Sequence, residues 1–203
     1  LATQFLGAIN DNMFRWLVVP IGKQTVQDER AAIALSLGLV SFVVPYLLLA
    51  SVAGYLADRF SKRTIIVACK IAELVIMAMG VVSILIGNLY VMLSVIALMG
   101  AQSALFAPSK FGIIPEMVPT RRVAAANGLI GMTTVVAIIL GTILGNLLYV
   151  VTTLTDDSGE LLKPAGQHML WISAISLVGV SAIGLMCSLL IGRTPAANPS
   201  RKF

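Results

Sequence analysis

Polar and charged side chains interrupt the first apolar stretch of the chain at positions where they could contact a ligand. Asn10, Asp11, Asn12 and Arg15 lie in the middle of a predicted helix over residues 1–26. Ionisable groups inside a membrane span are costly and usually face a cavity or a partner. Asp11 and Arg15 are four residues apart, so they share a helix face and can pair. Two readings follow: a substrate site on this helix, or a pair whose charges only neutralise each other.

Two further charged features lie in apolar stretches. Lys70 and Glu73 are three residues apart, and we interpret them as a buried structural pair. Lys110 follows the fourth apolar stretch, where a lysine can extend its ammonium to the membrane surface without a special role.

Small residues recur at every fourth position in another stretch. Ala137, Gly141 and Gly145 therefore share one helix face, and small side chains let helix backbones approach closely. This stripe predicts a packing surface for a neighbouring helix.

The composition places these residues in a membrane. Apolar residues make up 58% of the chain and charged residues 11%, with a mean hydropathy of +0.96. Soluble domains carry about a quarter charged residues. Several uncharged runs reach the roughly 20 residues that cross a bilayer as a helix, and none alternates with the period of two typical of a membrane barrel. The sequence predicts an all-α membrane protein.

The apolar runs predict six transmembrane helices. Gly87-Asn88 is the turn signal that divides the long uncharged run 74–109. Pro108, Pro115 and Pro119 are expected to break the chain into an irregular basic segment that reaches Arg122. The expected helices cover residues 1–26, with Pro20 as a kink, 31–57, 64–86, 89–106, 123–151 and 168–191.

The expected domain is a bundle over residues 1–192, and a polar tail follows over residues 193–203. The chain opens at Leu1 without an initiator Met, which is typical of a piece of a longer protein.

Basic residues predict the orientation in the membrane. Most of the 14 Lys and Arg fall in loops or tails on one side, whereas the loops assigned to the other side are richer in Asp and Glu. Basic loops stay in the cytoplasm, so both termini of this segment are expected there. The net charge of +5 then reflects topology, and no nucleic acid partner is expected.

The sequence lacks the residue sets that enzymes use. His168 is the only histidine, so neither a Ser/His/Asp triad nor a histidine-based metal cluster can be assembled. No glycine-rich phosphate loop is present. Cys69 and Cys187 lie inside apolar runs, where cysteine behaves as a small hydrophobe. We expect no catalysis, cofactor, metal or disulfide in this chain.

The charged stretch 54–63 between the second and third predicted helices resembles the loop 2–3 signature of the major facilitator superfamily. Its matching positions are Gly54, Leu56, Ala57, Asp58, Arg59, Lys62 and Arg63, and Ser61 stands where the family usually has Gly. The resemblance implies a cytoplasmic latch made of Gly54, Asp58, Arg59, Lys62 and Arg63. The glycine would let the two helices approach, and the aspartate would bond to the second half. A plain loop that only sets topology is the alternative.

Three other stretches resemble the bacterial lysophospholipid transporters within that superfamily. They are residues 4–12, 107–116 and 126–130, the last followed by 138–145. The resemblance implies the N-terminal six of twelve helices, with residues 193–203 beginning a cytoplasmic linker to a second half. It also implies a 3+3 inverted repeat, the bacterial inner membrane and fusion in some members to acyltransferase domains. It also makes Lys110 a contact for a lipid phosphate and adds Asn127 to the substrate site. Gly131 replaces a Glu that is usual in the family, so the headgroup preference stays open.

The hypothesis from sequence is transport of a lysophospholipid, such as lysophosphatidylethanolamine, by alternating access between two six-helix halves. The expected partners are this substrate, membrane lipids, the C-terminal half and fused acyltransferase domains. One alternative is a drug or metabolite exporter, which Asn146 disfavours because the antiporter motif has Pro there. Another is a membrane anchor for a fused acyltransferase. The expected substrate contacts are Asn10, Asp11, Asn12, Arg15, Lys110 and Asn127.

Overall fold

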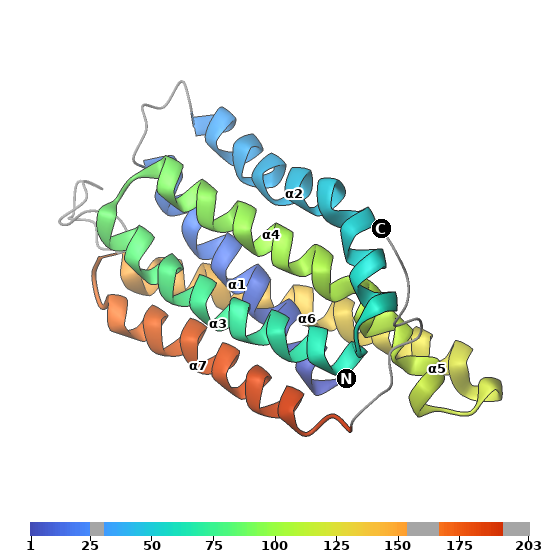
Figure 1. Ribbon diagram of the computed structural model, residues 1–203. Helices are drawn as coiled ribbons and strands as arrows, with labels where there is room; N and C mark the ends of the chain where they lie inside the picture. The colour runs from blue at the N-terminus through green and yellow to red at the C-terminus, as the bar shows by residue number, and fades with distance from the viewer. Residues whose placement is uncertain (25–30, 154–166, 193–203) are drawn as a thin grey trace.

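The computed structural model describes residues 1–24, 31–153 and 167–192, and these ranges are helical without a strand. Six long helices lie side by side, and a short helix and a single 3-10 turn connect α4 to α6 (Figure 1). The elements are α1 Ala2–Gln24, α2 Ala31–Arg59, α3 Lys62–Ile86, α4 Leu89–Gly112, α5 Ile114–Met117, η2 Thr120–Arg122, α6 Val123–Thr152 and α7 Leu170–Leu189.

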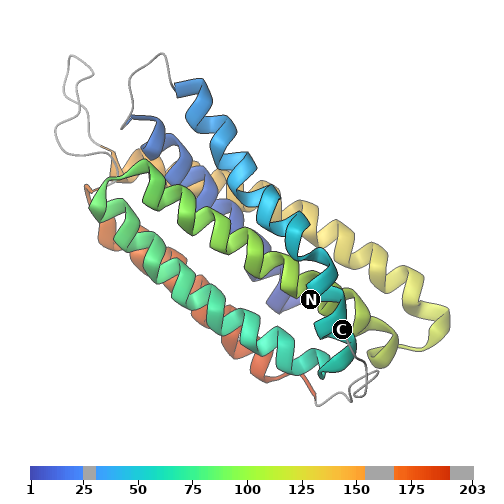
Figure 2. The ribbon, with the colours of Figure 1, turned by 45° about the horizontal axis from the view of Figure 1, so that its top comes forward.

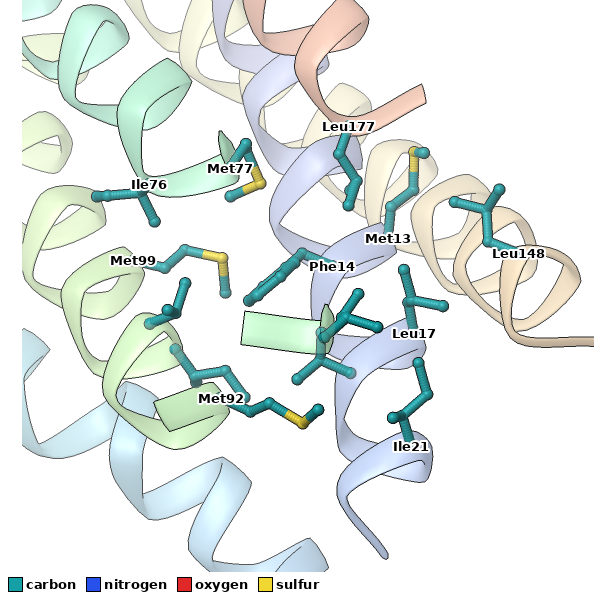
Figure 3. Packing of buried hydrophobic residues seen from close by; sticks show 14 of the residues in the cluster. Met13, Phe14, Leu17, Ile21, Ile76, Met77, Met92, Met99, Leu148 and Leu177 are labelled. Atoms are coloured by element: carbon teal, nitrogen blue, oxygen red, sulfur yellow. The ribbon is translucent and has the colours of Figure 1, made fainter. Parts of the chain in front are cut away.

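Helix α1 is the centre of the bundle. It packs against α2, α3, α4, α6 and α7, and it runs between them in both views (Figures 1 and 2). Its side chains Phe14, Leu17 and Ile21 are completely buried. Phe14 lies among Met77 of α3 and Met99 of α4 (Figure 3). The apolar core therefore forms around the helix that also carries Asp11.

The small-residue stripe of α6 is the surface on which α1 packs. Ala137, Gly141 and Gly145 are buried. A Cβ atom added at Gly141 would lie 2.5 Å from the carbonyl oxygen of Ile9, and one at Gly145 would lie 2.6 Å from that of Met13. Only residues without a side chain allow this backbone approach. The predicted packing surface is confirmed.

The predicted turn between the third and fourth apolar stretches is also confirmed. Gly87 ends α3 in the left-handed conformation, with φ 66°, which glycine adopts without strain. The side chain of Asn88 then accepts a hydrogen bond from the backbone N–H of Tyr90 at 2.9 Å and caps α4.

The charged stretch 54–63 is mostly helical, so the connection between α2 and α3 is shorter than the sequence predicts. Helix α2 continues to Arg59 and α3 begins at Lys62. Ser61 caps α3, because its Oγ accepts a hydrogen bond from the backbone N–H of Thr64 at 3.2 Å. The expectation that Gly54 lets α2 and α3 approach is wrong: a Cβ atom there would meet no described atom within 4 Å.

The predicted end of the fourth helix near Phe106 is wrong. Helix α4 continues through Pro108 to Gly112. A proline inside a helix removes one backbone hydrogen bond, and membrane helices tolerate this where neighbouring helices satisfy the freed carbonyl. The segment expected to be irregular contains α5 and η2, and Pro115 lies at the start of α5, where a missing N–H costs nothing.

Five helices of the described residues are long and apolar enough to cross a membrane: α2, α3, α4 with α5, η2 with α6, and α7. The chain is therefore a multi-pass membrane protein. Helix α1 is not among the five, because its central polar residues lower its hydropathy. The predicted loops at 27–30 and 155–164 and the predicted linker at 193–203 lie outside the described residues.

Candidate functional site

One carboxylate oxygen of Asp11 accepts a hydrogen bond, and the other accepts none from the described residues. It is partly buried on α1, and its Oδ2 accepts a hydrogen bond from the Ser103 hydroxyl of α4 at 2.8 Å. Its Oδ1 is buried and has no hydrogen-bond partner among the described residues. Leaving a charged acceptor buried and unpaired is costly, so such an atom is a candidate for ligand contact.

Arg15 lies one turn further along α1 but does not neutralise Asp11 by direct contact. Its guanidinium carbon lies 4.5 Å from the centroid of the Phe42 ring of α2, a cation–π arrangement. Within the described part of the chain, no ion pair at 4 Å or less joins Arg15 to Asp11. The Arg15 Nε is buried and has no hydrogen-bond partner in the described part of the chain. The two charges are held separately, which favours the reading of a site over that of a self-neutralised pair.

Asn10 and Asn12 point away from Asp11. Asn10 is completely buried, and its Nδ2 donates to the Ser181 Oγ of α7 at 2.7 Å. Asn12 donates to the carbonyl oxygen of Ala8 at 2.7 Å, and its Cβ lies beside Gly141 of α6. Successive helical residues are ~100° apart around the axis, so three consecutive side chains cannot share a face. Asn10 is thus hydrogen-bonded to α7, whereas Asn12 bonds within α1 and only packs against α6.

Lys110 belongs to the Asp11 region, whereas Asn127 does not. Lys110 lies on α4 two turns after Ser103, and its charge interacts electrostatically with Asp11. Its Nζ is 4.8 Å from the centroid of the Phe111 ring. Asn127 is exposed on α6 and has no described contact with this group.

Lys110 also lines a cavity of about 580 Å³ at the end of the bundle where α1 begins. The walls come from α1, α3, α4, α5, α6 and α7 and are mainly apolar. Gln4 is a polar exception: its amide N–H donates to the Thr134 hydroxyl, and its Oε1 is buried without a partner among the described residues. An apolar space with a cation on its wall suits an amphipathic molecule.

The basic residues of the predicted latch contact this half of the protein. Arg59 donates to the Tyr55 hydroxyl, and Lys62 is buried and forms an ion pair with Glu116 of α5. The Arg63 Nη2 donates to the carbonyl oxygen of Leu189 at 3.1 Å, at the end of α7. Asp58 is partly buried and also has a partner. These contacts tie the start of α3 to α5 and α7.

Sequence reasoning missed two partners of the site, Ser103 and Phe42. Gln102 and Ser103 are adjacent polar residues in the uncharged run 74–109, and that interruption was the available signal. Phe42 carries no signal, since nothing distinguishes it from other apolar residues of α2. Lys70 and Glu73 form the expected buried pair, with Nζ and Oε2 2.5 Å apart.

Comparison with known proteins finds a matching family model and similar curated proteins. The family model of the Major Facilitator Superfamily matches residues 4–202. The chain is 32% identical to "Lysophospholipid transporter LplT" of Cronobacter sakazakii, over 100% of this chain and 45% of that protein. It is 29% identical to the protein of the same name from Serratia proteamaculans, over 98% of this chain and 44% of that protein. No solved structure matches the chain significantly.

The extent of these matches defines what this chain corresponds to. It spans a little under half the length of these two curated relatives. The family model covers nearly every residue, including the charged stretch 54–63 and the polar centre of α1. The chain therefore belongs to the major facilitator superfamily.

Proposed function

We propose that this chain is the N-terminal half of a lysophospholipid transporter that works by alternating access. The observation that carries the proposal is the Asp11 carboxylate of the central helix, whose buried Oδ1 has no partner among the described residues and which has the basic Arg15 and Lys110 nearby. The names of the relatives support the substrate class.

The arrangement matches the chemistry of a zwitterionic headgroup. The free Oδ1 of Asp11 can accept a hydrogen bond from an ammonium or a glycerol hydroxyl, and Arg15 and Lys110 can donate to a phosphate. The apolar wall beside Lys110 suits the start of a single acyl chain. Asn10 serves the site by bonding α1 to α7 and Asn12 by packing beside Gly141 of α6, and Asn127 is an outer contact at the exposed start of α6.

The proposed architecture has six spans, with α1 as the sixth. Neighbouring helices shield the polar residues of α1 from lipid, so α1 can cross the membrane at a lower cost than its hydropathy suggests. The six helices form a 3+3 inverted repeat, and a C-terminal six-helix half completes the transport path. The stretch 54–63 forms a latch at the face towards that half, with Asp58 as the residue that bonds across.

The proposed location is the bacterial inner membrane, with both termini of this segment in the cytoplasm, as the basic loops indicate. The chain itself carries transport and not catalysis, and any acyltransferase would lie on a fused domain. A membrane anchor would need no unpartnered carboxylate in its central helix, so this observation favours transport over anchoring.

The substitution Asp11→Asn in the full-length protein tests the proposal. It keeps the shape of the side chain and removes its charge, so the protein should insert normally. Uptake of lysophosphatidylethanolamine into spheroplasts should fall at least ~10-fold, equivalent to ~1.4 kcal/mol. Thr133→Val is the matched control, because the Thr133 hydroxyl bonds only to carbonyls of its own helix. Wild-type uptake by Asp11→Asn would show that Asp11 has only a structural role.

A further inference from the structure

The Lys70–Glu73 pair is a second charged group in the bundle interior that the proposed function does not use. The two side chains are 1% and 3% exposed, and Nζ and Oε2 are 2.5 Å apart. Burying an ion pair costs several kcal/mol of desolvation, which the mutual attraction often fails to offset. A well-packed apolar pair would serve α3 as well or better, so packing alone does not account for this pair.

The pair lies where α3 meets three other helices. The Lys70 ammonium lies directly against Gly7 of α1, where an added Cβ atom would overlap it. It is 5.4 Å from the centroid of the Phe106 ring of α4, and it also lies beside Gly184 of α7. Gly7 precedes Asp11 by one turn of α1, so the pair is close to the substrate site.

Hydrogen bonds on α4 reinforce this proximity. Gln102 donates to the carbonyl oxygen of Cys69 at 3.1 Å, directly before Lys70, and the adjacent Ser103 donates to Asp11. One stretch of α4 thus fixes α3 and α1 relative to each other. Glu73 Oε1, like Asp11 Oδ1, is buried without a partner among the described residues.

The charged group around Asp11 has three positive members, Arg15, Lys70 and Lys110, and two negative ones, Asp11 and Glu73, so its formal net charge is +1. Both Glu73 and Lys70 act electrostatically on Asp11, as does Arg15 of its own helix, and Lys110 of α4 also interacts with it. Neutralising Glu73 would make this group more positive by one charge, and neutralising Lys70 would make it more negative by one. Buried charges are screened little by salt, so the site should respond to either change.

We propose that the Lys70–Glu73 pair sets the headgroup-charge selectivity of the Asp11 site. The pair touches α1 at Gly7 and acts through Asp11, so both members are positioning residues. With both charges present, the site favours a zwitterionic lysolipid. An excess of positive charge shifts it towards an anionic one. This inference rests on the proposed function.

The test measures uptake of two lysolipids by the full-length protein in proteoliposomes. Lysophosphatidylethanolamine is the zwitterionic substrate and lysophosphatidylglycerol the anionic one, and the readout is the ratio of their kcat/KM values. Glu73→Gln should raise the anionic-to-zwitterionic ratio at least ~5-fold, and Lys70→Gln should lower it by a similar factor, as expected for a unit charge acting across protein interior.

The controls separate this role from a structural one. Lys70→Arg and Glu73→Asp keep the charges and should keep the wild-type ratio. A pair that serves only packing would lower uptake of both lysolipids equally, and an unchanged ratio in the two Gln variants overturns the inference.

Two further outcomes are also decisive. If the Gln variants do not insert, the exchanged pair Lys70→Glu with Glu73→Lys replaces them. It keeps two opposite charges together and places the positive charge at position 73, whose charge acts on Asp11 more strongly than that at position 70, so it should raise the ratio. An unchanged ratio in this variant overturns the inference too. A wild-type protein that transports neither lysolipid contradicts the proposed function itself, whereas transport with an unchanged ratio contradicts only the role of the pair.

Discussion

Ser103 determines how Asp11 presents its carboxylate. The hydroxyl of α4 donates to Oδ2 on α1, and this leaves Oδ1 as the atom available to the proposed substrate. The same side chain also lies within 3.4 Å of the Gln102 amide oxygen. A serine at this position therefore orients the acidic group and keeps it on the side of α1 that faces α4.

We expect Ser103→Ala to weaken substrate binding while leaving insertion unchanged. Hydrogen bonds to charged groups contribute about 1.5–3 kcal/mol, so KM for lysophosphatidylethanolamine should rise ~10-fold or more in proteoliposome uptake. Ser94→Ala is the control, because Ser94 is an exposed residue of the same helix that bonds only to the Tyr90 carbonyl. Equal KM values for the two variants would remove Ser103 from the site.

At the scale of residues, sequence alone identified the charged groups but not their partners. Asp11, Arg15, Lys70 and Glu73 are conspicuous because charge is rare in apolar runs. The partner of Asp11 is 92 residues away in the chain, and only the packing of α1 against α4 brings it close. For the same reason, Asn10 and Asn12 could not be assigned to α7 and α6 from their spacing.

Contact between α1 and α6 depends on residues that lack side chains. The carbonyl oxygens of Ile9 and Met13 on α1 lie where side chains at Gly141 and Gly145 would begin. Without a hydrophobic driving force between helices in lipid, such close packing is a principal source of association. The position of Asp11 in the bundle therefore depends on α6 as well as on α4.

Gly141→Ala should destabilise the bundle although alanine favours helix formation. The added methyl group would displace α1, and overpacking of this kind costs about 1–3 kcal/mol. The melting temperature of the purified full-length protein should fall by at least ~3 °C. Gly179→Ala in α7 is the control, since a Cβ atom there meets no described atom within 4 Å. A melting temperature for Gly141→Ala equal to that of the control would contradict the role of the stripe.

At the scale of elements, local signals located the turns better than the helix ends near proline. Gly87 and Asn88 work through their own backbone and side chain, so the turn between α3 and α4 was predictable. Pro108 lies inside α4 because apolar neighbours and membrane packing outweigh one lost hydrogen bond. The two short connecting elements around Pro115 and Pro119 are too short to show a helical repeat of apolar residues. The sequence therefore carries no signal for them.

At the scale of the whole chain, the described residues form a bundle with five evident spans and a central helix that the other long helices surround. This arrangement explains why the fold class followed from composition while the number of spans did not follow from hydropathy alone. The proposed topology with six spans places the stretch 54–63 and the loop around Asp157 on opposite sides of the membrane.

Single cysteines at Ser61 and Asp157, in a protein from which Cys69 and Cys187 have been removed, test this topology. With six spans, a membrane-impermeant maleimide applied from outside should label the cysteine at position 157. It should label position 61 only after permeabilisation, because the basic loop stays in the cytoplasm. The Cys-free protein without an introduced cysteine measures the background labelling. Labelling of both positions from the same side would contradict six spans.

The central place of α1 has a consequence for biogenesis. The ribosome makes α1 before the helices that supply its polar partners. Asp11 is bonded by α4, Gln4 by α6 and Asn10 by α7. Its hydropathy is too low for ready partitioning into lipid by itself, and its buried amides would then face hydrocarbon without partners. We therefore expect the nascent α1 to remain in the insertion machinery until the later helices are made. The bundle would then assemble cooperatively, after α7 has been synthesised.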